Sequence, residues 1–188
     1  MSRLLLAAAL LLALPLGAAA QDSDPLALLA YGDSLVHGYG LAGPDNFPAQ
    51  LEAALRAEGR EVQVINGGNS GDTTAAGLAR LDWTLSETPD AAIVVLGAND
   101  ALRGLDPART YENLDALLAR FEELGVPVLL AGMLAPRNLG SDYAEEFDGV
   151  FPRLAAEREV LFYPFFLDGV ATDPELNQPD GIHPNAEG

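Results

Sequence analysis

Four side chains, spread over three short polar segments, have the types needed to transfer an acyl group. Ser34 stands in a Gly-Asp-Ser sequence, Asn99 in a Gly-Ala-Asn-Asp sequence, and Asp180 precedes His183 by three residues. Acyl transfer by serine needs a base with a pKa near neutrality and a carboxylate that fixes the tautomer of that base. The Asn99 amide can donate a hydrogen bond to an oxyanion without titrating. These four residues are therefore candidates for one site.

The base must be one of the two histidines in the sequence. His183 has Asp180 three residues before it and a rigid proline directly after it. His37 lies three residues after Ser34, a spacing at which side chains on one helical turn can meet. Its neighbouring carboxylate, Asp33, can be occupied by the turn itself. We therefore expect His183 to be the base.

Each candidate also has a purely structural interpretation. A Gly-Asp-Ser sequence is compatible with a turn that carries a solvated hydroxyl, and Asn-Asp pairs are common in turns and helix caps. Gly71 could bring a backbone N–H close to a ligand, but loops use glycine for many other reasons. The catalytic hypothesis depends on the residues occurring together.

Other chemistries have little support in the sequence. The two histidines are far apart, cysteine is absent and no His-x-x-x-His spacing occurs, which argues against a zinc site. The chain contains no lysine, so it has no P-loop, and it lacks the G-x-S-x-G sequence of α/β-hydrolases. We expect a reaction that uses neither metal nor organic cofactor.

Apolar runs alternate with helical patterns after residue 25, as in a parallel α/β sheet forming a single domain. A proline, Pro152, is expected to kink or split the last helix. Ser34 and Asn99 directly follow predicted strands, and ligands bind at the carboxyl ends of strands in such sheets. The predicted strands are 26–31, 62–65, 91–96, 128–131 and 160–163, and the predicted helices are 47–58, 73–83, 110–124 and 143–158.

The chain of 188 residues is strongly acidic, with 28 acidic against 10 basic side chains and a formal net charge of −18. Such a surface repels phosphate backbones and anionic lipid headgroups, so nucleic acid is not an expected partner. The charge by itself identifies no substrate.

The first 20 residues have the pattern of a signal peptide. Arg3 supplies the positive charge, residues 4–16 are apolar, and small residues lead up to Ala20. Cleavage there would start the mature protein at Gln21 and export it to the periplasm or beyond. The apolar run is too short for a comfortable membrane span, so we expect no stable membrane anchor.

Four sequence blocks, in order, resemble the SGNH or GDSL hydrolase family. The resemblance is greatest to its periplasmic branch of thioesterase I, lysophospholipase and arylesterase. The blocks begin at Tyr31 (YGDSL), Asn69 (NSGDTT), Leu96 (LGANDALRG) and Asp180 (DGIHPN). Together they extend over nearly the whole mature chain.

This resemblance implies a flavodoxin-like three-layer α/β/α sandwich with a five-stranded parallel sheet. It implies Ser34 as the nucleophile, Asp180 and His183 as its partners, and an oxyanion hole formed by the Asn99 side chain and the N–H groups of Ser34 and Gly71. Ala98 and Ala101 stand where this branch commonly has glycine, and we expect them to narrow the site slightly. The closing helix of the family is also missing, so we expect the sequence to be truncated at its C-terminus.

The expected activity is hydrolysis of small acyl esters or thioesters by a monomeric enzyme. Two alternatives remain: a carbohydrate O-deacetylase with the same triad, and a non-catalytic periplasmic binding protein. Phe165 and Phe166 fit a core better than a pocket. The candidates for an acyl-binding groove are Leu105, Met133, Leu134, Tyr143 and Phe147.

Overall fold

The computed structural model describes residues 24–188 and contains one sheet of five parallel strands, in the order β2-β1-β3-β4-β5. The predicted signal peptide, residues 1–20, lies outside the described residues. Every pair of neighbouring strands in the sheet is parallel. Successive strands are connected through helices, which confirms the predicted α/β class. The strands are β1 (Leu26–Gly32), β2 (Val62–Gly68), β3 (Ala91–Val95), β4 (Val128–Ala131) and β5 (Leu161–Tyr163).

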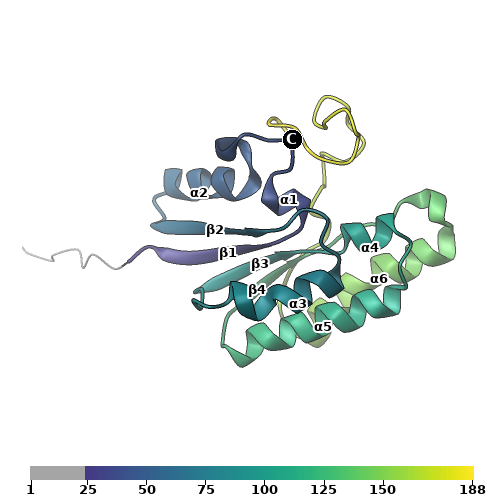
Figure 1. The fold of residues 1–188 in the computed structure, drawn as a ribbon, viewed down its shortest axis with the longest axis horizontal. Helices are drawn as coiled ribbons and strands as arrows, with labels where there is room; N and C mark the ends of the chain where they lie inside the picture. The colour runs from purple at the N-terminus through teal and green to yellow at the C-terminus, as the bar shows by residue number, and fades with distance from the viewer. Residues whose placement is uncertain (1–23) are drawn as a thin grey trace, which may run out of the picture.

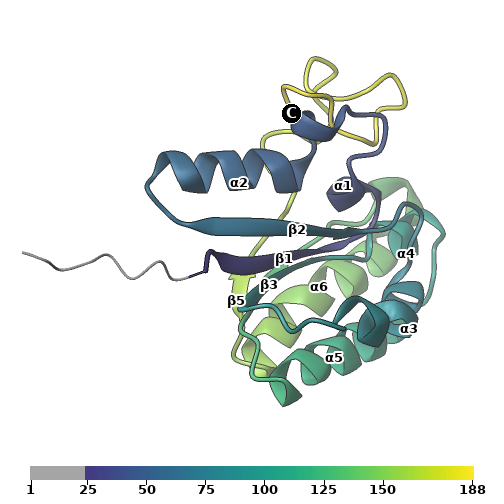
Figure 2. The ribbon, with the colours of Figure 1, turned by 60° about the vertical axis from the view of Figure 1, so that its left-hand side comes forward.

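Helices cover both faces of the sheet and give the expected three layers. Helix α2 lies on one face, and α3, α5 and α6 lie on the other (Figures 1 and 2). No helix within residues 24–188 is long and apolar enough to cross a membrane. The helices are α1 (Ser34–His37), α2 (Phe47–Ala57), α3 (Thr74–Thr84), α4 (Ala98–Leu102), α5 (Pro107–Glu123) and α6 (Ser141–Glu157), with 3₁₀ turns at Gly43–Asp45 and Arg137–Leu139.

The predicted long elements are present, with two informative differences. Helix α6 continues through Pro152 instead of splitting there. Phe147, Phe151 and Leu154 on its inner face are buried, and this packing outweighs the one backbone hydrogen bond that a proline cannot make. Helices α1 and α4 are too short to show a 3.6-residue pattern, which is why the sequence did not predict them.

The functional end of the sheet is where β1 turns into α1. A Cβ atom at Gly32 would lie 2.4 Å from the carbonyl oxygen of Val95, so only glycine allows this close packing. Asp33 caps α1, because its Oδ1 accepts a hydrogen bond from the Leu35 N–H at 3.0 Å. The nucleophile candidate Ser34 is therefore the first residue of a helix that starts directly at the sheet edge.

Asp33 is fully buried, and this burial raises the pKa of its carboxyl group to about 6. Hydrogen bonds from the Leu35 N–H and the Asn99 amide act in the opposite direction, because they favour the charged form. Burial is the larger effect. The carboxylate is thus kept in the fold at a cost in stability once it ionises.

The raised pKa of Asp33 predicts a pH-dependent contribution to stability. This contribution is complete below the ordinary pKa of 3.8 and is lost as the pH rises through about 6. Asp33→Asn cannot ionise, so its unfolding free energy relative to wild type should rise by about 2 kcal/mol between about pH 4 and pH 7. Urea unfolding of both proteins at the two pH values measures this change. A difference that is the same at both pH values would contradict the prediction.

Candidate active site

The structure brings Ser34, Asp180 and His183 together in one chain of hydrogen bonds. His183 Nε2 lies 2.9 Å from Ser34 Oγ, and His183 Nδ1 lies 2.7 Å from Asp180 Oδ2. The segment after β5 returns to lie beside α1 (Figures 1 and 2). This segment contains Asp180 and His183 and brings them to Ser34. The geometry is that of a nucleophile, a base and a carboxylate that orients the base.

Asp180 is held in its charged form. Its Oδ1 accepts hydrogen bonds from the N–H groups of Ile182 at 2.9 Å and His183 at 3.1 Å. The Ile182 N–H, together with the His183 ring and N–H, lowers the pKa of Asp180 to about 2. An ionised carboxylate only accepts hydrogen bonds, so Nδ1 carries the imidazole proton and Nε2 presents its lone pair to the Ser34 hydroxyl.

The imidazole of His183 is also supported from its sides. The Tyr39 ring packs against it, with a centroid distance of 4.7 Å. Gln178 donates from its backbone N–H to the His183 carbonyl at 2.7 Å, and from Nε2 to the Tyr39 carbonyl at 2.7 Å. These contacts join the loop that carries His183 to the loop that follows α1. The alternative base, His37, is exposed at the end of α1.

The two other predicted oxyanion donors follow β3 and β2, the two strands that flank β1 in the sheet. Asn99 lies in the first turn of α4, after β3, and Gly71 lies in the loop after β2. The Asn99 side-chain NH₂ donates to Asp33 Oδ2 at 3.3 Å. Gly71 has a φ of +86°, a conformation that favours glycine, and its carbonyl accepts a hydrogen bond from Arg103 at 2.9 Å.

A buried aspartate, Asp100, connects the segments that carry these two donors. The Thr74 N–H and hydroxyl donate to its two oxygens at 2.8 and 2.6 Å. Both side chains are buried, so water does not compete for these bonds. Asp100 thereby fixes the first turn of α4 against that of α3. The sequence pattern alone does not indicate this role for Asp100, although Asp100 stands next to Asn99 in the motif.

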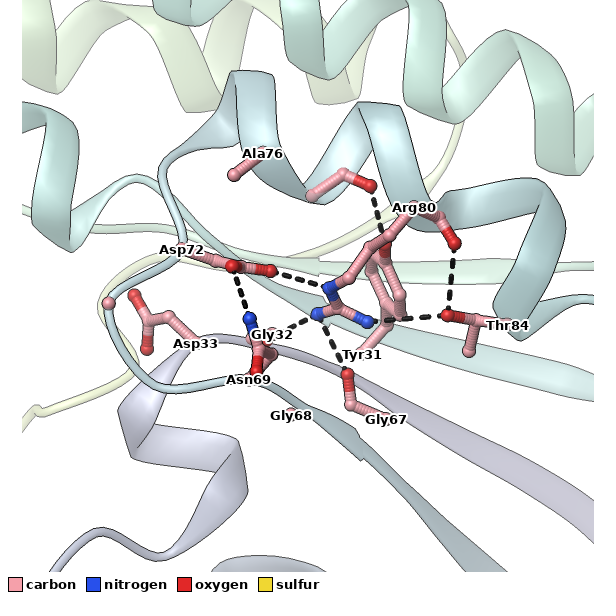
Figure 3. A network of polar contacts seen from close by, with 12 residues as sticks. Tyr31, Gly32, Asp33, Gly67, Gly68, Asn69, Asp72, Ala76, Arg80 and Thr84 are labelled. Carbon is pink, nitrogen blue, oxygen red and sulfur yellow. Dashed lines mark hydrogen bonds and ion pairs between the residues drawn. The ribbon is translucent and has the colours of Figure 1, made fainter.

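Arg80 of α3 joins the ends of two strands beneath the site (Figure 3). Its Nη2 donates to the carbonyl oxygens of Gly32 and Gly67, each at 2.9 Å. Its Nε pairs with Asp72, the residue after Gly71, at 2.5 Å. The guanidinium therefore connects the ends of β1 and β2 to the Gly71 loop. Sequence reasoning missed this network, because nothing in the spacing of Arg80 indicates which carbonyls it meets.

A cavity of about 580 Å³ opens beside the serine. Most of its lining is apolar, and its polar lining residues are Ser34, Asn99, Arg137, Thr172, Asn177 and His183. The apolar lining includes two of the candidates for the acyl groove, Met133 and Leu134, together with Ala98 and Ala101. Phe165, which we had expected to fit the core better, also contributes.

Three of the predicted groove residues lie outside this cavity lining. Phe147 is fully buried and packs edge-to-face on Phe151, with ring centroids 5.5 Å apart, so it belongs to the core. The Tyr143 hydroxyl donates to the Leu105 carbonyl at 2.9 Å, and its ring stacks on Phe147. The helical pattern of α6 correctly predicted an inward-facing side chain, but the inward direction leads to the core and not to the groove.

Within residues 24–188, no group of three or more His, Asp or Glu side chains is arranged to hold a metal ion. The polar groups around Ser34 are instead directed at one another, with the carboxylates of Asp33 and Asp180 each accepting hydrogen bonds from the protein.

Comparison with known proteins agrees with the resemblance found in the sequence. Residues 30–188 match the GDSL-like Lipase/Acylhydrolase family. The chain is 42% identical to an arylesterase of Vibrio mimicus, covering 92% of this chain and 86% of the relative. It is 38% identical to thioesterase 1/protease 1/lysophospholipase L1 of Escherichia coli K12, over 90% and 79% of the two chains.

Among solved structures, the chain is similar to AlinE4, described as an SGNH-hydrolase family esterase. The TM-score is 0.82 and the sequence identity 48%, with 88% of this chain and 89% of that chain covered. Sequence, fold and site geometry agree. The chain belongs to the GDSL-like lipase/acylhydrolase family.

Proposed function

We propose that the chain is a serine hydrolase that cleaves carboxylic ester or thioester bonds through an acyl-enzyme on Ser34. The observation that carries the proposal is the continuous hydrogen-bonded chain from Asp180 through His183 to the Ser34 hydroxyl, with distances of 2.7 and 2.9 Å. The relatives named arylesterase and thioesterase support the same reaction class.

In the first half of the reaction, Ser34 Oγ attacks the acyl carbonyl carbon while its proton moves to His183 Nε2. The ionised Asp180 stabilises the imidazolium that forms. The carbonyl oxygen becomes an oxyanion, which accepts hydrogen bonds from the Asn99 amide and from the N–H groups of Ser34 and Gly71. A single donor of this kind contributes about 3 kcal/mol in known serine enzymes.

The tetrahedral intermediate then collapses. The bond to the alcohol or thiol breaks, and the leaving group takes the proton from His183. In the second half, a water molecule gives a proton to His183 and attacks the Ser34 ester. When this second intermediate collapses, the acid is released and the proton returns to Ser34 Oγ. The mechanism uses neither metal nor cofactor.

The shape and polarity of the cavity favour an acyl chain over an acetyl group alone. Its volume of about 580 Å³ is larger than an acetyl group needs, and much of its lining is apolar. The carbohydrate O-deacetylase is therefore the second candidate, since sugar binding would favour a broad aromatic platform such as a tryptophan near Ser34. The single tryptophan, Trp83, is 83% exposed near the end of α3 and does not line the cavity.

The setting of the enzyme is part of the proposal. The signal-like pattern of residues 1–20 supports export to the periplasm or outside the cell. The strongly acidic composition argues against a nucleic acid partner, and we expect the enzyme to act as a monomer on a small acyl ester or thioester.

The first test is hydrolysis of p-nitrophenyl esters from acetate to palmitate. We expect wild-type turnover with an optimum above acetate, and a loss of about four orders of magnitude or more in kcat for Ser34→Ala. An acetate optimum would favour the deacetylase. No hydrolysis by a folded wild-type protein would contradict the esterase proposal and favour a binding role.

The second test concerns the acyl groove and uses two leucines of similar exposure. Leu134, 41% exposed, lines the cavity, whereas Leu105, 39% exposed, does not. Leu134→Trp should fill the groove and lower kcat/KM for octanoate and longer esters about tenfold or more, with acetate changed less than about threefold. Leu105→Trp is the matched control and should leave the chain-length profile unchanged. Equal effects of the two variants would contradict the assignment of the groove.

A further inference from the structure

One buried carboxylate beside the nucleophile has no part in the proton transfers described above. We infer that Asp33 is a positioning residue, whose second oxygen holds the Asn99 amide in the orientation that donates to the oxyanion. This inference rests on the proposed function, and it assigns to Asp33 a role beyond starting helix α1.

The two oxygens of Asp33 serve two different partners. Oδ1 accepts the Leu35 N–H at 3.0 Å, and Oδ2 accepts the Asn99 Nδ2 at 3.3 Å. The side chain is fully buried, so bulk water does not replace either partner. Each oxygen has one identified donor, and the two bonds connect the nucleophile's helix to the first turn of α4.

A carboxylate selects one of the two orientations that an asparagine amide can take. It only accepts hydrogen bonds, so the NH₂ group of Asn99 must face Asp33 and the carbonyl oxygen must face elsewhere. An NH₂ group carries two hydrogens, and the second remains for the cavity that Asn99 and Ser34 both line. With the amide rotated by half a turn, the carbonyl oxygen of Asn99 would take the place of this NH₂ group and would repel the oxyanion.

The charged groups around Asp33 lead to a rival explanation. His183 attracts the Asp33 carboxylate and lowers its pKa, whereas Asp72 repels it and raises its pKa. Asp72 lies near Asp33 but is paired with Arg80 (Figure 3). Asp33 could therefore assist catalysis by stabilising the His183 imidazolium directly. That effect would not depend on Asn99, so the two explanations can be separated.

The substitution Asp33→Asn isolates the second hydrogen bond. Asparagine caps helices about as well as aspartate, so the bond to the Leu35 N–H can be kept by its one carbonyl oxygen. Its NH₂ group then faces the NH₂ group of Asn99, and two donors cannot pair. Asn99 relieves this conflict by rotating its amide. Asp106 caps α5, away from the site, by accepting a hydrogen bond from the Ala108 N–H at 2.9 Å. Asp106→Asn is therefore a control for the same substitution at another helix cap.

The experiment is a double-mutant cycle with p-nitrophenyl butyrate as the probe, on wild type, Asp33→Asn, Asn99→Ala and the double variant. We expect Asp33→Asn to lower kcat about tenfold to a hundredfold, with KM within about twofold. In the Asn99→Ala background, Asp33→Asn should lower kcat less than about threefold, because the amide that Asp33 positions is no longer present. The control Asp106→Asn should keep kcat within about twofold of wild type.

Circular dichroism melts identify any variant that fails to fold. Asp33→Ser then gives the same test, because serine also caps helices but its hydroxyl is too short to serve both partners. A wild-type kcat in the Asp33 variants would overturn the inference while leaving the proposed function intact. An equal fold-loss of kcat in the Asn99→Ala background would also overturn the inference. If the acid-limb pKa of the kcat/KM profile were lowered as well, the effect would be assigned to His183. A wild-type protein inactive on every ester would overturn the proposed function, and this inference with it.

Discussion

At the ends of β1 and β2, the side chain of Arg80 donates hydrogen bonds to the carbonyl oxygens of Gly32 and Gly67. A guanidinium can do this because its donors diverge in one plane, toward Gly32, Gly67 and Asp72 together. The Tyr31 ring lies 4.3 Å from the guanidinium carbon and provides a favourable surface for the cation. Without this cation, two carbonyls and the buried carboxylate of Asp72 would each lose a hydrogen-bond donor. Ser34 lies two residues after Gly32, and Gly71 lies directly before Asp72.

Polar groups at this edge of the sheet are numerous for so buried a region, and they are satisfied by one another. Asp33, Asp72 and Asp100 are all buried, and no buried side-chain nitrogen or oxygen in residues 24–188 lacks a hydrogen-bond partner. Asp33 holds the nucleophile's helix and Asn99, and Asp100 holds the turn after Asn99 to α3. Such networks cost stability when charges are buried, and in return they fix side chains in one orientation.

The sequence predicted the long elements and the grouping of Ser34, Asp180 and His183, because apolar runs mark strands and few residue types can serve as nucleophile and base. It did not predict what surrounds them. The role of Asp33 depends on the Asn99 amide, 66 residues further along the chain, and no local sequence pattern indicates a contact between residues so far apart. Phe147 shows the same limit, since helical spacing indicates that a side chain faces inward but not whether core or groove lies there.

Activation of Ser34 by His183 is tested most directly by reaction with a fluorophosphonate, because this probe bonds covalently to activated serines. Intact-mass and peptide measurements should find a single adduct on Ser34 in the wild-type protein. In a folded His183→Ala variant the rate of labelling should fall at least about a hundredfold. Labelling at another residue, or a rate at Ser34 that does not change when His183 is removed, would contradict the account.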